Sequence, residues 1–140
     1  MQTTLTLTTH GPGLYEFTPQ VIAWLEEENP ATNGLLTVFI RHTSASLLIQ
    51  ENADPSVQAD LMGFLRRLVP PGDAPSMDWL THVFEGPDDM PAHIKAALLP
   101  VSLSIPISRG KLALGTWQGI YVFEHRSRPH ARQIVLHASR

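Results

Sequence analysis

Cysteine is absent from this chain of 140 residues, which excludes disulfide bonds, a thiolate nucleophile and zinc sites built on cysteine. A metal site would have to use histidine and carboxylate ligands. The chain also lacks an excess of positive charge, with a net charge of -3 and a pI of about 6.1. Because proteins that bind nucleic acids need clustered positive charge to replace counterions along the phosphates, we expect no nucleic-acid partner.

Long apolar segments are missing too. No apolar run approaches the ~20 residues that span a bilayer, and the start, Met1-Gln2-Thr3-Thr4, has neither the basic nor the apolar region of a signal peptide. We expect a cytoplasmic protein without a membrane partner. The sequence contains none of the usual nucleotide-binding, zinc-protease or serine-hydrolase motifs, and it indicates no organic cofactor.

What remains is the composition of an ordinary globular domain. The chain has 43% hydrophobic residues, enough for a core in a single domain covering residues 1–140. Strand-like segments fill the last third without intervening helices, a pattern typical of α+β proteins. We therefore expect a single α+β domain of mostly antiparallel sheet with two to three helices.

Strand and helix signals alternate in the first part of the chain. Thr18 followed by Pro19 resembles an N-cap and first helical position, and Asn29-Pro30 ends that helix. The polar stretch His42-Thr43-Ser44 is expected as a turn between two buried strands. The strands expected in this part lie at 4–8, 35–40 and 45–50.

A second helix is expected from Asp54-Pro55, where an aspartate cap precedes proline and apolar residues then recur at helical spacing. A connection from Asp73 to Asp88 follows, and connections of that length are often functional or mobile. A third helix begins at Asp88 or Asp89 and ends before Pro100. The strands expected after it lie at 101–107, 112–116, 120–124 and 133–138.

The segment Gly115-Thr116-Trp117-Gln118-Gly119 is unusual for its place between two strands. Its glycines suggest close approach of the backbone to a ligand or a subunit. Trp117 is more typical of packing in a core or an interface than of stacking on a pyrimidine, whereas the Gln118 amide must find hydrogen-bond partners. The ligand-binding candidates are Ser44, Thr116, Trp117 and Gln118.

Histidines at the ends of elements suggest a metal site. His42 follows a buried strand, His82 lies in the long connection and His93 lies in the helix after it. Three converging imidazoles with an open position would suit Zn²⁺ or another borderline metal. Each could equally be solvated or locally hydrogen-bonded, and His42 could instead be a proton donor. We expect the others at the surface, namely His10, His125, His130 and His137.

The catalytic candidates are Asn52, Asp54 and Glu124, and each has a structural alternative. Asp54 before proline is a favoured helix N-cap, and Asn52 could close a local turn. Glu124 at a strand end could pair with Arg126 or Arg132. It could also act as a base or orient a neighbouring histidine.

Several motifs in one order resemble the YjbQ-like family, also called secondary thiamine-phosphate synthases, over nearly the whole chain. The motifs are His42-Thr43-Ser44-Ala45-Ser46, Glu51-Asn52-Ala53-Asp54-Pro55, Glu85-Gly86-Pro87-Asp88-Asp89-Met90-Pro91-Ala92-His93, Ile105-Pro106-Ile107, Gly115-Thr116-Trp117-Gln118-Gly119-Ile120 and Glu124-His125-Arg126.

The resemblance implies a homotrimer of α+β subunits with a polar pocket built around histidines and sometimes a bound metal. It also implies a secondary activity that joins hydroxymethylpyrimidine diphosphate to thiazole phosphate and releases pyrophosphate. The chain departs from the family pattern at Pro100, where glycine is common, and at Arg128-Pro129-His130, which replaces a glycine-rich turn. The second departure removes support for a phosphate-holding role of that turn.

The synthase chemistry would need Mg²⁺ or cationic side chains to neutralise the leaving pyrophosphate, yet the sequence shows no aspartate-rich motif and no tight Lys/Arg cluster. Two alternatives therefore stay open. One is a metal-dependent hydrolase with a divalent ion, Zn²⁺ or Mg²⁺, on His42, His82 and His93, and with Asp54 or Glu124 as base. The other is a non-enzymatic trimer that binds a small phosphorylated or heteroaromatic molecule against Trp117 and Gln118.

Overall fold

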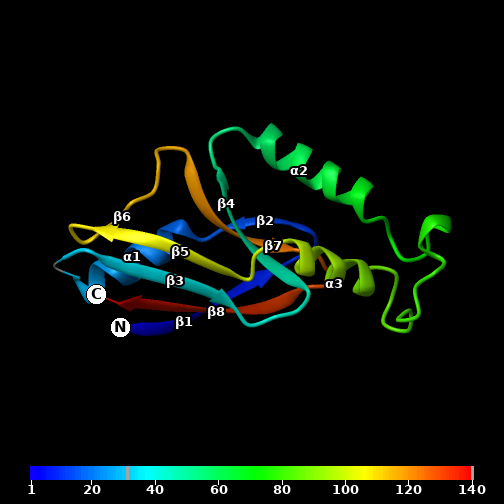
Figure 1. Cartoon of the computed structure of the whole chain (residues 1–140), viewed down its shortest axis with the longest axis horizontal. Coiled ribbons are helices and arrows are strands. Elements are labelled where there is room, and N and C mark those ends of the chain that lie inside the picture. The colour runs from blue at the N-terminus through cyan, green and yellow to red at the C-terminus, as the bar shows by residue number, and fades with distance from the viewer. Residues whose placement is uncertain (31, 140) are drawn as a thin grey trace.

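The computed structural model describes residues 1–30 and 32–139. Figure 1 shows the strands gathered at one end of the molecule and two helices, α2 and α3, at the other. In chain order the elements are β1 (Gln2–Thr9), β2 (Gly13–Glu16), α1 (Thr18–Glu28), β3 (Gly34–Ile40), β4 (Ala45–Glu51), α2 (Pro55–Leu68), a 3₁₀ turn η1 (Pro75–Met77), α3 (Asp89–Leu98), β5 (Ser102–Ser108), β6 (Lys111–Leu112), β7 (Gln118–Glu124) and β8 (His130–Ser139).

The strands form two antiparallel sheets. The larger has the order β1-β8-β3-β5-β6 and the smaller the order β2-β7-β4. Every strand pair in both sheets is antiparallel. The expected α+β fold with mostly antiparallel sheet and up to three helices is confirmed.

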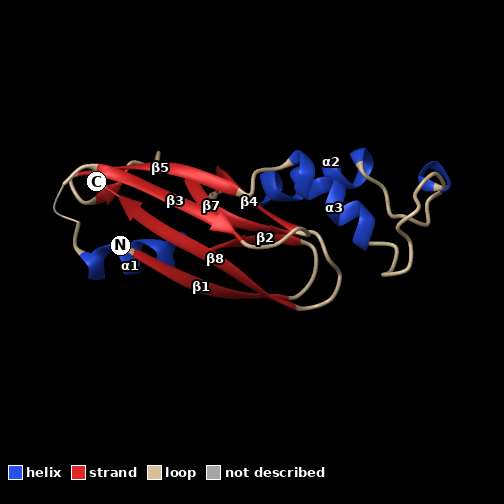
Figure 2. Ribbon diagram, turned by 60° about the horizontal axis from the view of Figure 1, so that its bottom comes forward, coloured by secondary structure: helices blue, strands red, loops and turns tan. Residues whose placement is uncertain are grey.

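The core draws side chains from both sheets and from α1. Along β3 the buried residues are Leu36, Val38 and Ile40, the alternation expected when one face of a strand is turned inward. They share one apolar cluster with Leu47 of β4 and Val21 of α1. Figure 2 shows α1 beside the strands, away from the end occupied by α2 and α3. The two sheets and α1 thus enclose the core, and α2 and α3 lie at the other end of the molecule.

Two local expectations were wrong, and one strand was missed. Thr18 is the first residue of α1 and Phe17 its N-cap; the Thr18 hydroxyl donates to Glu16 and accepts from the Ile120 amide. The strand expected at 112–116 ends at Leu112, because a turn closes where the Gln118 side chain accepts from the Gly115 amide. Strand β2, which pairs with β7, was not foreseen.

Helix α2 begins where the sequence predicts. Asp54 is its N-cap, and the Asp54 carboxylate accepts from the Ser56 amide at 2.9 Å. Leu65 is its buried residue, whereas Phe64 and Leu68 are more than half exposed. Within residues 1–30 and 32–139, no helix is long and apolar enough to cross a membrane.

Candidate functional site

The first turn of α3 brings a carboxylate and an imidazole together. Asp89 and His93 are four residues apart, and side chains at that spacing share one face of a helix. The Asp89 Oδ2 and His93 Nε2 atoms are 3.3 Å apart. The Asp89 side chain is almost completely buried, so its charge needs a compensating partner.

His82 joins this pair from the connection before α3. His82 Nε2 lies 2.7 Å from Asp89 Oδ2 and 2.9 Å from Oε2 of the exposed Glu85. The His82 and His93 rings meet edge to face, with centroids 5.8 Å apart. One ligand atom from each of His82, Asp89 and His93 lies within 4.8 Å of the others. Among the described residues, this is the histidine and carboxylate grouping that could hold a metal ion.

The orientation of His93 is fixed from outside the cluster. His93 Nδ1 lies 2.9 Å from the Thr43 carbonyl oxygen. A carbonyl oxygen can only accept, so Nδ1 carries the proton and a neutral His93 turns the lone pair of Nε2 toward Asp89. A nitrogen lone pair and a carboxylate oxygen at 3.3 Å repel one another unless a proton or a cation lies between them.

Asp89 is held in place by an arginine. Arg126, which follows β7 and is buried, donates from its Nη1 to Asp89 Oδ1 and from its Nε to Asp88 Oδ2, the latter at 2.9 Å. Ser127 donates to the same Asp88 oxygen from its amide and its hydroxyl. Outer hydrogen bonds of this kind typically orient metal-binding carboxylates and histidines.

The charges and hydrogen bonds around Asp89 favour positive charge beside it. The hydrogen bond to Asp89 raises the pKa of His82. Burial tends to raise the pKa of Asp89, but hydrogen bonds from His82 and other neighbours and the charge of Arg126 lower it. For Asp88, burial is likewise opposed by hydrogen bonds from Ser127 and Arg126, which lower its pKa to about 2. Asp89 is therefore a carboxylate that favours either a proton on His82 or a metal cation beside it.

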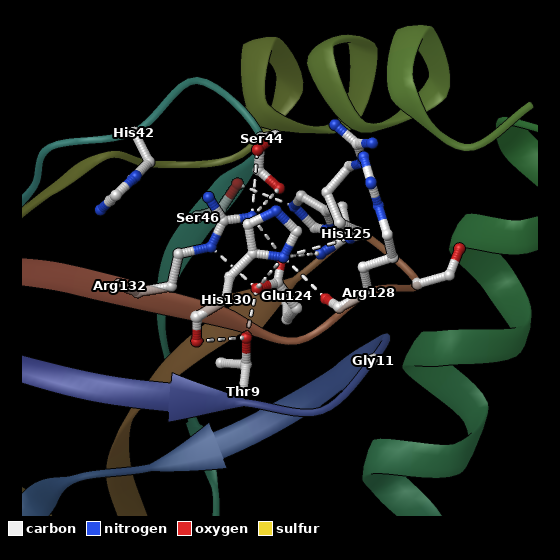
Figure 3. A network of polar contacts seen from close by, with 12 residues as sticks. Thr9, Gly11, His42, Ser44, Ser46, Glu124, His125, Arg128, His130 and Arg132 are labelled. Atoms are coloured by element: carbon white, nitrogen blue, oxygen red, sulfur yellow. Dashed lines mark hydrogen bonds and ion pairs between the residues drawn. The ribbon is translucent and has the colours of Figure 1, made fainter. Parts of the chain in front are cut away.

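Glu124 belongs to a separate buried network (Figure 3). Its carboxylate is inaccessible to solvent and accepts from Thr9 Oγ1, from Arg132 Nε at 2.8 Å, and from two successive main-chain amides after β7. Although burial tends to raise its pKa, the hydrogen bonds from Arg132 and Thr9 lower it. Arg132 also donates to the Ser44 hydroxyl at 3.0 Å. This geometry favours the ion-pair alternative for Glu124, with Arg132 as partner, over the catalytic one.

His42 does not belong to the possible metal-binding group, in which Asp89 joins His82 and His93. It does line a cleft together with His93. The Gln133 amide donates to His42 Nε2 at 2.8 Å, so a neutral His42 carries its proton on Nδ1. Burial and the nearby Arg132 charge lower the pKa of His42. The cleft measures about 670 Å³ and is also lined by Arg41, Ser44 and residues of α3. The structure thus places His42 as an acceptor from the Gln133 amide, in the lining of the cleft that also contains His93.

The remaining candidates lie at the other end of β4. Asn52 is exposed and donates from Nδ2 to Glu16 at 3.3 Å, and its amide donates to the Trp117 carbonyl at 3.0 Å. Asp54 is exposed and caps α2. Neither belongs to the grouping around Asp89.

The glycine-bounded segment approaches its own chain closely. A Cβ atom on Gly119 would lie 2.5 Å from Glu16 Oε2 and 3.1 Å from the Asn52 Cβ, which explains this glycine without a ligand. Thr116 is exposed, and Trp117 is 62% exposed, so Trp117 does not pack in the core of the protein. Gln118 finds its partner locally, in the Gly115 amide at 2.8 Å.

Sequence reasoning missed three members of the site: Asp89, Glu85 and Arg126. Asp89 has a ready interpretation as a helix cap, and its spacing of four residues from His93 was the signal that could have identified it as a ligand. His125 was expected at the surface but is only 3% exposed. It follows directly on β7, and its ring packs 4.9 Å from the Phe123 ring, centroid to centroid.

Known proteins resemble this chain over nearly its whole length. The family model described as UPF0047 protein YjbQ-like matches residues 3–140. A UPF0047 protein of Synechocystis sp. is 49% identical over 138 residues, which cover 99% of this chain and 90% of the relative. The UPF0047 protein YjbQ of Salmonella typhimurium is 42% identical over 134 residues, or 96% of this chain and 94% of the relative.

Solved structures share the fold. A crystal structure of an uncharacterised YjbQ/UPF0047 family protein from Clostridium acetobutylicum has a TM-score of 0.82 and 34% identity, covering 99% of both chains. A hypothetical protein of Aeropyrum pernix K1 has a TM-score of 0.86 and 28% identity, covering 99% of this chain and 98% of that one. The resemblance found in the sequence motifs is thereby confirmed.

Proposed function

The chain belongs to the YjbQ-like UPF0047 family, and we propose that it is a divalent-metal-dependent hydrolase whose ion is held by His82, Asp89 and His93. The observation that carries this proposal is the arrangement of the three ligand atoms within 4.8 Å of one another. Two imidazoles and a carboxylate suit Zn²⁺ and other borderline metals, whereas Mg²⁺ prefers oxygen ligands. The fixed Nε2 lone pair of His93 and the anchored Asp89 carboxylate fit such an ion.

A bound divalent ion supplies a Lewis acid for a substrate oxygen and makes water a stronger nucleophile near neutral pH. The chain's own residues would position the substrate. The cleft that contains His93 is also lined by His42, whose Nδ1 can donate, by the guanidinium of Arg41, and by the apolar Phe39 and Val101. A small molecule with a carbonyl or phosphoryl oxygen and a modest apolar group fits this lining. Glu85, beside His82, is the exposed carboxylate nearest to the cluster and our candidate for the base.

The test is metal content measured together with activity. We expect about one ion per subunit in the purified protein by inductively coupled plasma mass spectrometry. His82→Ala and His93→Ala should lose the ion and hydrolysis of p-nitrophenyl esters and phosphates, whereas His42→Ala should keep the ion and lose activity. The exposed His10→Ala is the matched control. Full metal content in both ligand variants would refute the site.

Thiamine-phosphate synthesis is the second candidate, and family resemblance supports it. One structural feature favours it as well, because the exposed Trp117 ring is free to stack on a heteroaromatic ring. The assay is formation of thiamine phosphate from the two precursors with Mg²⁺. A kcat/KM near ~10⁴ M⁻¹s⁻¹ would indicate a dedicated synthase, and a value several orders lower would indicate an incidental activity.

We also propose that the subunit forms a homotrimer in the cytoplasm. Exposed apolar residues on α2 and in two loops support assembly, because large apolar side chains at a surface often mark an interface. These residues are Phe64, Leu68, Trp79, Phe84 and Trp117. Light scattering coupled to size exclusion should give three times the 15.5 kDa of the chain, and a monomer at micromolar concentration would contradict the proposal.

A further inference from the structure

A second cleft lies between α2 and the far side of α3. It measures about 280 Å³, and its lining includes Met62, Arg66 and Val69 from the α2 side, Lys95 from α3 and His125 after β7. Lys95 follows His93 by two positions, which turns it by about 200° around the helix axis. The face of α3 that lines this cleft therefore lies on the other side of the helix from His93.

Two cationic side chains, Arg66 and Lys95, line this cleft, and neither is paired with an acidic side chain of the described residues. Among residues 1–30 and 32–139, neither Arg66 nor Lys95 has a side-chain hydrogen bond or an ion pair within 4.0 Å. Both side chains line the same cleft of about 280 Å³, so their charges share one small space. Two adjacent like charges destabilise one another, and an anion between them would remove that cost.

The one carboxylate in the cleft is already compensated. Asp88 lines the cleft, but its Oδ2 atom accepts from Arg126 Nε and from the amide and hydroxyl of Ser127, each at 2.9 Å. Asp88 forms no ion pair with Lys95 within 4.0 Å. Arg66 and Lys95 therefore bring two positive charges to a cleft whose one carboxylate is already engaged by Arg126 and Ser127.

His125 provides an independent sign of a missing partner. The residue is 3% exposed, yet its Nδ1 atom is buried without a hydrogen bond in the described part of the chain. Its other ring nitrogen, Nε2, lies 2.9 Å from the Ser46 hydroxyl. Buried polar atoms in native proteins nearly always have a partner, and an exception often marks a bound group. When the Ser46 hydroxyl donates to Nε2, the ring proton sits on Nδ1 as an unused donor.

We propose that this cleft is a binding site for the phosphoryl group of a small molecule, held by Arg66 and Lys95, with the His125 imidazole also in the lining. Arginine presents several donors in a plane that match two phosphoryl oxygens, and lysine adds a mobile point charge. The apolar side chains of Met62 and Val69 would contact the organic part of such a ligand. The site lies outside the proposed metal centre and extends the proposed function.

The experiment is a titration of the full chain with inorganic phosphate and with phenyl phosphate at constant ionic strength, followed by calorimetry. Arg66→Met and Lys95→Met should each raise Kd at least tenfold. The neighbouring Arg67→Met removes the same charge from the next position of α2 and should leave Kd unchanged. Because Arg66 is exposed, its replacement tests the site without threatening the fold.

Two further measurements distinguish binding in this cleft from binding at the metal cluster or at scattered surface charges. The histidine ¹⁵N spectrum of the wild-type protein should show a shift of the His125 Nδ1 resonance on addition of phosphate. His93→Gln should bind phosphate as the wild type does, because the cleft is on the other side of α3. Equal weakening by Arg67→Met, loss of binding in His93→Gln, or an unresponsive His125 resonance would each overturn the proposal.

Tighter binding of phenyl phosphate than of inorganic phosphate identifies a phosphate ester as the ligand, whereas equal binding would contradict a role for the organic part.

Discussion

The Glu124 carboxylate and the Arg132 guanidinium form a buried ion pair on which the end of β7 depends. Both side chains are nearly inaccessible to solvent, and removing one partner of such a pair leaves an uncompensated charge that costs about 3 to 5 kcal/mol. We predict that Arg132→Met lowers the free energy of unfolding by that amount in urea denaturation. Glu27→Gln on the exposed face of α1 should change it by less than about 0.5 kcal/mol.

A simultaneous change of both partners tests whether the effect comes from the uncompensated charge. Glu124→Gln combined with Arg132→Met should be less destabilising than the sum of the two single changes, because no lone charge stays buried. If the single changes are additive, the ion pair does not couple these residues, and the structural role given to Glu124 is wrong.

His125 makes stability depend on pH in a defined window. Burial is the main cause, and Lys95 the next, that lowers its pKa to about 3, whereas an unfolded histidine titrates near 6.5. Below pH 6.5 the unfolded chain binds a proton at His125 that the folded chain does not. The contribution of neutral His125 to the free energy of unfolding is therefore fully present above pH 6.5 and is lost as the pH decreases toward 3. The predicted slope approaches about 1.4 kcal/mol per pH unit.

The measurement is urea unfolding of wild type and His125→Gln between pH 7 and pH 5, above the range in which exposed carboxylates titrate. Because His42 and His82 contribute alike to both proteins, the difference in slope between wild type and His125→Gln isolates His125 and should approach about 1.4 kcal/mol per pH unit, whereas the exposed His137→Gln should keep the wild-type slope. An unchanged slope in His125→Gln would mean that another group binds the proton on unfolding.

The N-terminus of α2 allows the two roles of Asp54 to be separated. As the N-cap it accepts from both the amide and the hydroxyl of Ser56, and loss of such a cap costs about 1 kcal/mol. We predict that Asp54→Ala lowers the melting temperature and that Asp54→Ser restores it, since serine also caps helices. A catalytic carboxylate would not be replaced by serine, so loss of activity in a stable Asp54→Ser protein would support catalysis instead.

Elements with local signals were predictable from the sequence, and those that depend on distant partners were not. The start of α2 was predictable because its N-cap, Asp54, and its first residue, Pro55, are adjacent in the sequence. In contrast, β2 is four residues long and depends on pairing with β7, more than a hundred positions later. A period-two pattern cannot be read in so short a segment.

The same distinction explains what was found of the site. His82 and His93 were named because few residue types bind borderline metals. Asp89 was missed as a ligand because its place at a helix start already had a local explanation. Arg66 and Lys95 lie 29 positions apart on two helices, and only the packing of α2 near α3 brings them to one cleft. The spacing of these residues in the sequence does not indicate how the two helices pack.

At the scale of the whole molecule, the proposed ion would link segments that the core does not hold. His82 lies in the connection before α3, His93 is hydrogen-bonded to Thr43 between β3 and β4, and Asp89 is anchored by Arg126 after β7. The connection itself is exposed over most of residues 81–87. An ion at the cluster would therefore restrain this connection against the end of both sheets.

We predict that Zn²⁺ stabilises the folded protein through this link. A ligand that binds only the folded state at 100 times its Kd adds about 2.7 kcal/mol, so chelation by EDTA should lower the melting temperature and slow addition of Zn²⁺ should restore it. Hydrogen exchange should become faster in residues 81–87 after chelation, with little change in β3 or β8, because the core cluster lies within the sheets. His93→Gln should show neither response, whereas the exposed His10→Gln should show both. An equal gain in melting temperature in His93→Gln would locate the stabilising ion elsewhere, and faster exchange throughout β3 and β8 would mean that the ion supports the whole fold and not this connection.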